Sequence, residues 1–491
     1  MQKTALFVNM LTLCVLLFSV SACSIKKQET LQPNIIFIMA DDLGYGHLGC
    51  YGQEIIQTPY IDKLAEEGMR FTQAYSGSSL CAPARSTLMT GTHAGHTPVR
   101  GNGGGVSLRD NDVTIAELLN KAGYATGLFG KWGLGEEGTE GIPNKQGFDE
   151  FFGYLHQLHA QFYYPEFLWE NEKKFFIKEN ANDKCGIYSH DLIMERAKEF
   201  VEKNQNQPFF LYLPLAIPHH EFVAPDEAMK QYSGKFKERP IPFWRKGYAL
   251  PDEPRATMAA MISHMDKGIG ELMELLDSLN LDENTLVIFT SDNGAAHGPL
   301  PDPDFFNASG PLRGLKGSLY EGGIRVPMIA RWKGKIEDGS ESEFVNFFPD
   351  IFPTLAEIGM ASEYVPDMLD GISFAPVFFG EENQNQHEFL YWENANYERI
   401  PPYGEVEGSL EQAILLDNWK AVKNNPDLPI ELYNISQDIS ETTNLASEHP
   451  ELIKKIETMM KKEHHQAPPQ VDMTAKEAQE LYVPEVFCRE E

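Results

Sequence analysis

The stretch NIIFIM at residues 34–39, followed closely by Asp41 and Asp42, decides the fold of this chain. A short apolar run that ends at polar residues is typical of a strand buried in a sheet. The same pattern returns at residues 124–129, 209–213 and 286–290, which we predict as further strands. The chain is therefore expected to build its core on buried strands of this kind.

Helical patterns lie between these strands. Residues 58–67 fit a helix, with Thr58 as N-cap, Pro59 at the first helical position and Gly68 at its end. Residues 114–121 and 258–279 fit further helices. Strands that alternate with helices predict an α/β sandwich around a mainly parallel sheet.

Polar side chains follow each predicted strand. They are Asp41 and Asp42, Lys131, His219, and Asp292 with Asn293. In open α/β sheets the ligand site lies beyond the carboxyl ends of the strands. We therefore expect these side chains to converge in one crevice.

The acidic and amide groups of this set are hard oxygen ligands, which suit Ca²⁺ or, less well, Mg²⁺ rather than zinc. Taken alone, a pair of acids after a strand is more often a turn or cap than a metal site. Cys81 has its own context, because Pro83 suits the first turn of a helix and would leave Cys81 at the helix N-terminus with Arg85 one turn on. That position suits a nucleophile, although a buried structural thiol is the alternative.

Composition narrows the class of protein. The chain has 491 residues, 42% of them hydrophobic, and carries 41 Lys+Arg against 72 Asp+Glu for a formal charge of -31. A surface of this sign repels phosphate backbones, so nucleic acid is excluded as an expected partner, and any anion site must be a local cluster of cations and metal. The cysteines lack CxxC spacing, which indicates neither a zinc site nor a disulfide framework.

The chain also divides along its length. Lys3, an apolar run at 5–20 and small residues before Cys23 have the order of a signal peptide, residues 1–23. Residues 20–23 (VSAC) resemble a lipobox, which predicts an exported bacterial lipoprotein anchored in the membrane through Cys23, periplasmic or on the cell surface. A plain cleaved signal is the alternative. Shorter apolar runs later in the chain predict a catalytic domain over residues 33–380 and a smaller α+β domain over 381–491.

One ordered set of motifs resembles a known family. Cys81-x-Pro83-x-Arg85, with LMTG at 88–91, resembles the signature of the type I sulfatases. Further motifs occur in that family's order: DDLGYG at 41–46, GKW at 130–132, PH at 218–219, SDNG at 291–294, KGSLYEGG at 316–323, and ELYN at 431–434 with NLA at 444–446. The resemblance covers about residues 33–465, and ordered motifs are far more specific than a single one.

The resemblance implies a member of the alkaline-phosphatase superfamily, similar to bacterial polysaccharide and aryl sulfatases. The implied fold is an alkaline-phosphatase-like α/β/α sandwich around a large mainly parallel sheet, with a smaller C-terminal α+β domain. The implied activity is that of a sulfuric ester hydrolase. A formylglycine-generating enzyme would convert Cys81 to formylglycine. One hydroxyl of the hydrated aldehyde would attack sulfur while the substrate alcohol leaves, and the second would then lose its proton so that sulfate is expelled and the aldehyde returns.

The resemblance also assigns roles by position. Ca²⁺ would be held by residue 81 with Asp41, Asp42, Asp292 and Asn293. Lys131 and Lys316 would hold the sulfate oxygens, Arg85 would orient residue 81, and His219 would bind sulfate and protonate the leaving alcohol.

The expected substrate is a sulfated glycan, with a lean toward a galactose-type residue. The stretch at 154–165 is rich in aromatic and imidazole groups, and it places His156, His159 and Tyr163 as candidates to bind sugar, with His297 from another loop. A packed surface loop is the alternative reading of this stretch.

Two departures from the family pattern stand out. Gly133 occupies the place of a usual histidine two residues after the motif lysine, so the proton acceptor for sulfate release is open among His297, His96, His156, His159, water and Lys131. His47 stands where an acid is common, and the sequence offers no account of it.

Rival functions follow from the same residues. One is a phosphodiester or phosphonate monoester hydrolase of the same superfamily. The other is a lipoprotein that binds sulfated glycan without turnover, for which Gly133 is the support.

Overall fold

The central strand of the structure is β1 (Asn34–Ala40), and every residue of it is buried. It pairs in parallel with β8 (Phe209–Pro214) on one side and with β9 (Thr285–Ser291) on the other. β8 also pairs in parallel with β4 (Ala125–Lys131). The strands predicted from the apolar runs are therefore confirmed, and they are neighbours in one sheet.

The computed structural model describes residues 32–102, 106–182, 184–239, 241, 248–381, 384–394, 410–466 and 475–482. The predicted signal peptide and Cys23 lie outside these residues. None of the described helices is both long and apolar enough to cross a membrane.

The large sheet has ten strands in the order β11-β2-β10-β9-β1-β8-β4-β5-β6-β7. Its centre, from β9 to β5, is parallel, whereas β10 and the β6–β7 end are joined to it by antiparallel pairing. The sheet is therefore mixed, and the prediction of parallel strands holds for the part that carries the site. The strands not yet bounded are β2 (Met69–Phe71), β5 (Glu150–Tyr154), β6 (Phe167–Glu170), β7 (Lys173–Phe176), β10 (Met328–Arg331) and β11 (Ser340–Ser342).

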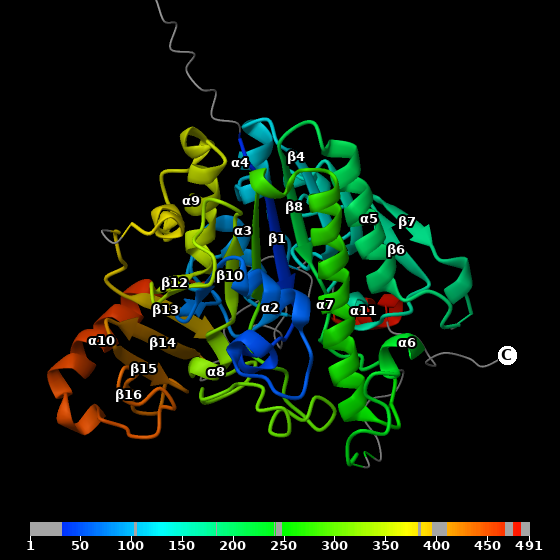
Figure 1. Ribbon diagram of the computed structural model, residues 1–491. Coiled ribbons are helices and arrows are strands. Elements are labelled where there is room, and N and C mark those ends of the chain that lie inside the picture. The colour runs from blue at the N-terminus through cyan, green and yellow to red at the C-terminus, as the bar shows by residue number, and fades with distance from the viewer. Residues whose placement is uncertain are drawn as a thin grey trace, which may run out of the picture. The chain divides into compact units, whose positions relative to one another are not determined.

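Alternation along β1 builds a core on each face of the sheet. Ile36 and Ile38 pack with side chains of α2, α5 and α7, whereas Ile35 and Phe37 pack with side chains of α3, α4 and α9. Successive side chains of a strand point to opposite faces, so one apolar run fills both cores. Figure 1 shows helices on both faces of the sheet, the predicted α/β/α sandwich. The helices are α2 (Pro59–Glu66), α3 (Cys81–Thr90), α4 (Ile115–Lys121), α5 (Ser189–Asn204), α6 (Asp226–Met229), α7 (Pro254–Ser278), α8 (Glu321–Ile324), α9 (Phe348–Ile358), α10 (Pro450–Glu463) and α11 (Ala475–Tyr482).

Local capping follows the sequence in one helix and departs from it in another. Thr114 caps α4, where its hydroxyl accepts from the Glu117 amide at 3.2 Å and the Glu117 carboxylate accepts from the Thr114 amide at 2.8 Å. α2 begins at Pro59 as predicted, but the Thr58 side chain makes no cap bond. The Thr58 hydroxyl instead accepts from the Gly49 amide at 2.9 Å, so a tertiary contact replaces the expected cap.

The C-terminal part forms a second sheet, in the order β13 (Leu390–Asn394), β14 (Glu411–Leu416), β15 (Trp419–Lys423) and β16 (Glu431–Asn434), all antiparallel. Ile456 and Met460 of α10 pack on this sheet, which confirms the smaller α+β element. A short parallel pair, β3 (Ala74–Tyr75) with β12 (Asn346–Phe347), precedes it in the chain. Cys185 is disulfide-bonded, which the cysteine spacing did not indicate.

A buried ion pair joins this second sheet to α8, which follows the large sheet's β9 in the chain. Lys420 of β15 lies 2.8 Å from a carboxylate oxygen of Glu321 in α8 and 3.8 Å from one of Glu441, and both the lysine and its partners are fully buried. Tyr75 donates to the other Glu321 oxygen at 2.7 Å. Loss of one partner from such a pair leaves a buried charge uncompensated.

We expect Lys420→Met to lower the free energy of unfolding by about 3 kcal/mol, because Glu321 and Glu441 lose their shared cation. Chemical denaturation measures this change. The matched control is Lys63→Met, which removes an exposed pair with Glu67 at 3.4 Å and should cost below about 1 kcal/mol. Equal losses in the two variants would contradict the structural role given to Lys420.

Candidate active site

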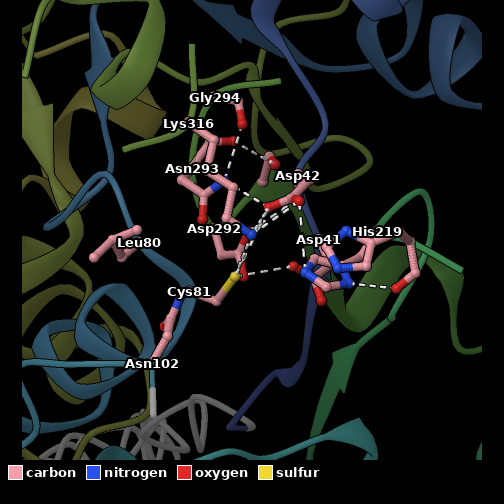
Figure 2. Close-up of polar contacts among 12 residues, drawn as sticks. Asp41, Asp42, Leu80, Cys81, Asn102, His219, Asp292, Asn293, Gly294 and Lys316 are labelled. Carbon is pink, nitrogen blue, oxygen red and sulfur yellow. Dashed lines mark hydrogen bonds and ion pairs between the residues drawn. The ribbon is translucent and has the colours of Figure 1, made fainter. Parts of the chain in front are cut away.

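The polar residues that follow the parallel strands meet at one edge of the sheet. Figure 2 shows Asp41 and Asp42 beyond β1 and Asp292 and Asn293 beyond β9, close to Cys81. Lys131 ends β4, and His219 follows β8. The convergence expected from the sequence is present because these strands run in the same direction and end together.

The acidic part of the site depends on an unusual backbone conformation. Asp42 has φ 65°, in the left-handed region that residues other than glycine rarely adopt. This turn ends the alternation of the strand, so Asp41 and Asp42 both present carboxylates to the same place. The Asp42 amide donates to Asp292 at 3.1 Å, and the Asn293 side-chain amide donates to Asp42 at 2.8 Å.

Cys81 is the first residue of α3, as the position of Pro83 predicted. The neighbouring Ala82 amide donates to the Asn102 side chain at 2.8 Å, which anchors the helix start. The Cys81 sulfur lies 3.3 Å from an Asp41 oxygen, and the Lys316 ammonium donates to it at 3.1 Å. Burial, followed by the charge of Asp41, raises the pKa of Cys81 well above its ordinary value. The encoded thiol is therefore neutral and is a poor nucleophile as it stands.

A basic side chain faces each acidic one. Lys131 donates to Asp41 at 2.6 Å and Lys316 lies 2.7 Å from Asp42. Burial alone would lower the pKa of Lys316, but the carboxylates, Asp42 foremost, hold it well above its ordinary value. The Lys316 ammonium therefore stays charged inside the protein.

Arg85 lies one turn beyond Cys81 and is fully buried. Its guanidinium donates to one Asp292 oxygen at 2.8 and 3.2 Å and to the carbonyl of Lys131 at 2.6 Å. These bonds connect α3 to the ends of β4 and β9. Arg85 thus fixes the framework around residue 81, and among the described residues its hydrogen bonds go to Asp292 and to the Lys131 carbonyl rather than to the sulfur.

The donor set fits a divalent cation. Ligand atoms of Asp41, Asp42, Cys81 and His219 all lie within 4.8 Å of one another. The side-chain oxygen of Asn293 is buried and has no hydrogen-bond partner among the described residues. A buried polar atom without a partner costs about 1–3 kcal/mol, and a cation would satisfy it. Carboxylate and amide oxygens are the ligands that hard cations prefer.

His219 faces the same cluster. Its Nε2 lies 3.7 Å from an Asp42 oxygen, and its Nδ1 donates to the His220 carbonyl at 2.6 Å. Burial, then the charges of Lys316 and Lys131, hold the pKa of His219 well below its ordinary value, so the ring is neutral. With the proton on Nδ1, the lone pair of Nε2 points toward the site.

The residues predicted to bind sugar lie in different environments. His156, His159 and Tyr163 are buried, whereas His297 is exposed. The Tyr163 hydroxyl hydrogen-bonds to the carbonyls of Ala216 at 2.7 Å and His219 at 2.9 Å, so it supports the segment that carries His219.

Other histidines have structural partners. His47 accepts from the Gly44 amide at 3.0 Å through its Nδ1, and burial lowers its pKa to about 4. His47 therefore stabilises the turn after Asp42, which answers a question that the sequence left open. His96 pairs with Asp370 at 2.9 Å.

Sequence reasoning missed Asn102. A lone asparagine in a loop carries no signal that it will meet a helix N-terminus from a different segment. The contact becomes visible only in the folded chain.

Comparisons with known proteins identify the family. The sulfatase family model matches residues 33–359, and the C-terminal model of N-sulphoglucosamine sulphohydrolase matches 315–468. The N-acetylgalactosamine-6-O-sulfatase of Bacteroides thetaiotaomicron is 29% identical over 88% of this chain and 93% of its own. Human arylsulfatase A is 35% identical over 73% of this chain and 70% of its own. The solved structure of Ps i-CgsB in complex with k-i-k-neocarrahexaose is 30% identical, with a TM-score of 0.73, over 91% of this chain and 96% of that one.

The alkaline-phosphatase-like fold, the motif order and the matching family model show that the chain belongs to the sulfatase family. It is a sulfuric ester hydrolase.

We expect Tyr163→Phe to lower kcat several-fold with KM unchanged, because the hydroxyl supports the His219 segment rather than substrate. The free energy of unfolding should fall by about 1–2 kcal/mol. Steady-state kinetics and chemical denaturation measure both changes. Tyr212→Phe is the stability control, because the Tyr212 hydroxyl is buried without a partner in the described residues. A rise in KM at constant kcat would instead assign Tyr163 to substrate binding.

Proposed function

We propose that this protein hydrolyses sulfate esters of sulfated carbohydrates, using a formylglycine formed from Cys81 and a bound Ca²⁺. The observation that carries the proposal is the place of Cys81 at the start of α3, against Asp41 and beside the Lys316 ammonium. A neutral thiol in a cation-binding pocket has little use as a nucleophile. The same position suits a hydrated aldehyde. One of its hydroxyls would form a bond to sulfur as the S–O bond to the substrate alcohol breaks and the alcohol leaves; the second would then lose its proton, so that the carbon–oxygen bond to sulfate breaks and the aldehyde returns.

The chain's own residues hold the reacting group. Asp41, Asp42 and Asn293 are placed to ligate the cation, with Asp292 held by Arg85 and by the Asp42 amide. When bound, Ca²⁺ supplies positive charge to the sulfate oxygens.

The lysines complete the anion site. Lys131 contacts Asp41, and Lys316 contacts Asp42. From these positions their ammonium groups can bind sulfate oxygens and stabilise the charge that develops on them. His219 is oriented through its Nδ1 bond, and its Nε2, which carries a lone pair in the neutral ring, would take up a proton before giving one to the leaving alcohol. Arg85 keeps residue 81 in position through the helix that they share.

The proposed substrate is a sulfated glycan with a galactose-type residue. The names of the Bacteroides relative and of the Ps i-CgsB complex support a sulfated-sugar substrate. His297 and the stretch from residue 157 to 169 are the proposed source of selectivity. We also propose export as a lipoprotein, with residues 1–23 as signal and Cys23 as the lipid anchor, and a formylglycine-generating enzyme as partner.

The mass of the tryptic peptide 71–85, from protein made in its native host, tests the proposal. We expect an aldehyde in place of the Cys81 thiol, detectable by mass and by reaction with a hydrazide. Cys50 is the internal control, since it should remain a free thiol and react with iodoacetamide after denaturation. An unmodified thiol at residue 81 throughout the sample would refute the mechanism and favour a glycan-binding role.

Metal removal tests the proposed role of Ca²⁺. Calcium at 100 times its dissociation constant should stabilise the protein by about 2.7 kcal/mol. Chelation with EGTA should abolish sulfate release, and Ca²⁺ should restore it better than Mg²⁺.

Thermal denaturation of variants locates the ion. Asn293→Leu should lose most of the calcium-dependent rise in Tm, because it removes the unpaired buried oxygen. The matched control is Asp350→Asn, in which a buried acid that pairs with His387 at 2.6 Å is changed away from the site. Equal calcium responses in the two variants would place the ion elsewhere.

A further inference from the structure

A side chain from another loop fills the space beside Gly133. Gly133 lies two residues beyond Lys131 and has φ +82°, in the left-handed region. A Cβ at this position would lie 1.9 Å from the Nε2 of Gln157, closer than any real contact. The absence of a side chain at Gly133 therefore leaves room for the amide of Gln157.

The Gln157 side-chain amide has a hydrogen-bond donor without an acceptor in the part of the chain that the structure describes. Gln157 is 5% exposed, and its Nε2 is buried without a hydrogen-bond partner among the described residues. A buried donor left in this state costs about 1–3 kcal/mol. Native structures contain few buried donors without a partner. One physical reason for such a donor is a ligand that accepts its hydrogen bond.

The location of Gln157 indicates the ligand. β4 and β5 run in parallel, with Lys131 opposite Tyr154, and the Gly133 amide continues the pairing by donating to the Leu155 carbonyl at 2.9 Å. This pairing brings the residues around 156 beside the lysine of the anion site. Burial, then the Lys131 charge, lowers the pKa of His156 to about 4, in keeping with this proximity.

The loop around Gln157 is held in place. The ring of Tyr482 in α11 stacks on the rings of His156 and His159, with ring centroids 5.0 Å and 4.8 Å apart, respectively. The Leu158 amide donates to Nδ1 of His156 at 2.9 Å. A donor fixed in this way needs little reorganisation when substrate binds, which is the condition for effective charge stabilisation.

We propose that Gln157 is a further catalytic residue: its amide group occupies the space beside Gly133, and its Nε2 donates a hydrogen bond to a sulfate oxygen of the substrate bound next to it. Sulfate oxygens only accept hydrogen bonds, so an unpaired N–H beside Lys131 suits them. The inference rests on the proposed function in taking a sulfate ester as the ligand. It adds a neutral donor to the charged groups of the site and accounts for the glycine at 133.

The test compares variants of the full-length, modified protein with 4-nitrocatechol sulfate as substrate. Gln157→Leu removes the donor at similar volume. Gly133→Ala keeps the glutamine but pushes its amide away. Gln412→Leu is the matched control, because the buried Gln412 amide donates to Tyr391 at 2.7 Å and to the Met460 carbonyl at 3.0 Å, in the C-terminal sheet.

We expect Gln157→Leu to lower kcat/KM about 100-fold, the effect of losing one preorganised donor. Its Tm should stay level or rise, because an unsatisfied donor is gone. Gly133→Ala should lose comparable activity with a lower Tm. Gln412→Leu should lose Tm and keep kcat/KM. Activity losses in Gln157→Leu that only match those of the control would overturn the proposal.

Binding of inorganic sulfate, measured by calorimetry, separates this inference from the proposed function. If the unaltered protein releases no sulfate from any ester, the proposed function fails. The role of Gln157 is still decided by comparing the sulfate affinity of Gln157→Leu with that of the unaltered protein. A several-fold weaker affinity supports it. Equal affinity overturns it.

Discussion

The structure depends on a balance of buried charge at the carboxyl ends of the parallel strands. Lys131 forms an ion pair with Asp41, Lys316 with Asp42 and Arg85 with Asp292. All of these groups are buried or nearly so. A single unpaired ion in this position would cost several kcal/mol. β1, β4, β9 and α3 each supply members of the set, so the sheet and the helix that carries Cys81 are placed by the same interaction.

The smaller C-terminal sheet takes part in this arrangement through its contact with α8. Lys420 pairs with Glu321, whose backbone amide donates to Glu441 at 2.8 Å. α8 begins five residues after Lys316, so these bonds fix the end of the segment that presents Lys316 to the site. The second sheet therefore contributes to the active site by helping to position Lys316.

Much of this was predictable from local patterns. Apolar runs that end at acids predicted β1 and β9, and Pro83 predicted the start of α3. The antiparallel pairing of β10 with β9, the Thr58 contact and the role of Asn102 were not predictable, because each depends on a partner outside the local helix or strand pattern. The burial of His156 and His159 is of the same kind, since the ring that covers them belongs to Tyr482, near the end of the chain.

The sequence by itself determined the buried strands that carry the site, the place of Cys81 at a helix start and the family, because apolar periodicity and motif spacing are properties of short segments. Only the tertiary structure decided which polar atoms are left without partners. The Asn293 oxygen and the Gln157 amide are such atoms. Whether a buried donor or acceptor is satisfied depends on everything packed around it, so the groups that we propose to bind a cation and a substrate are visible only after the chain has folded.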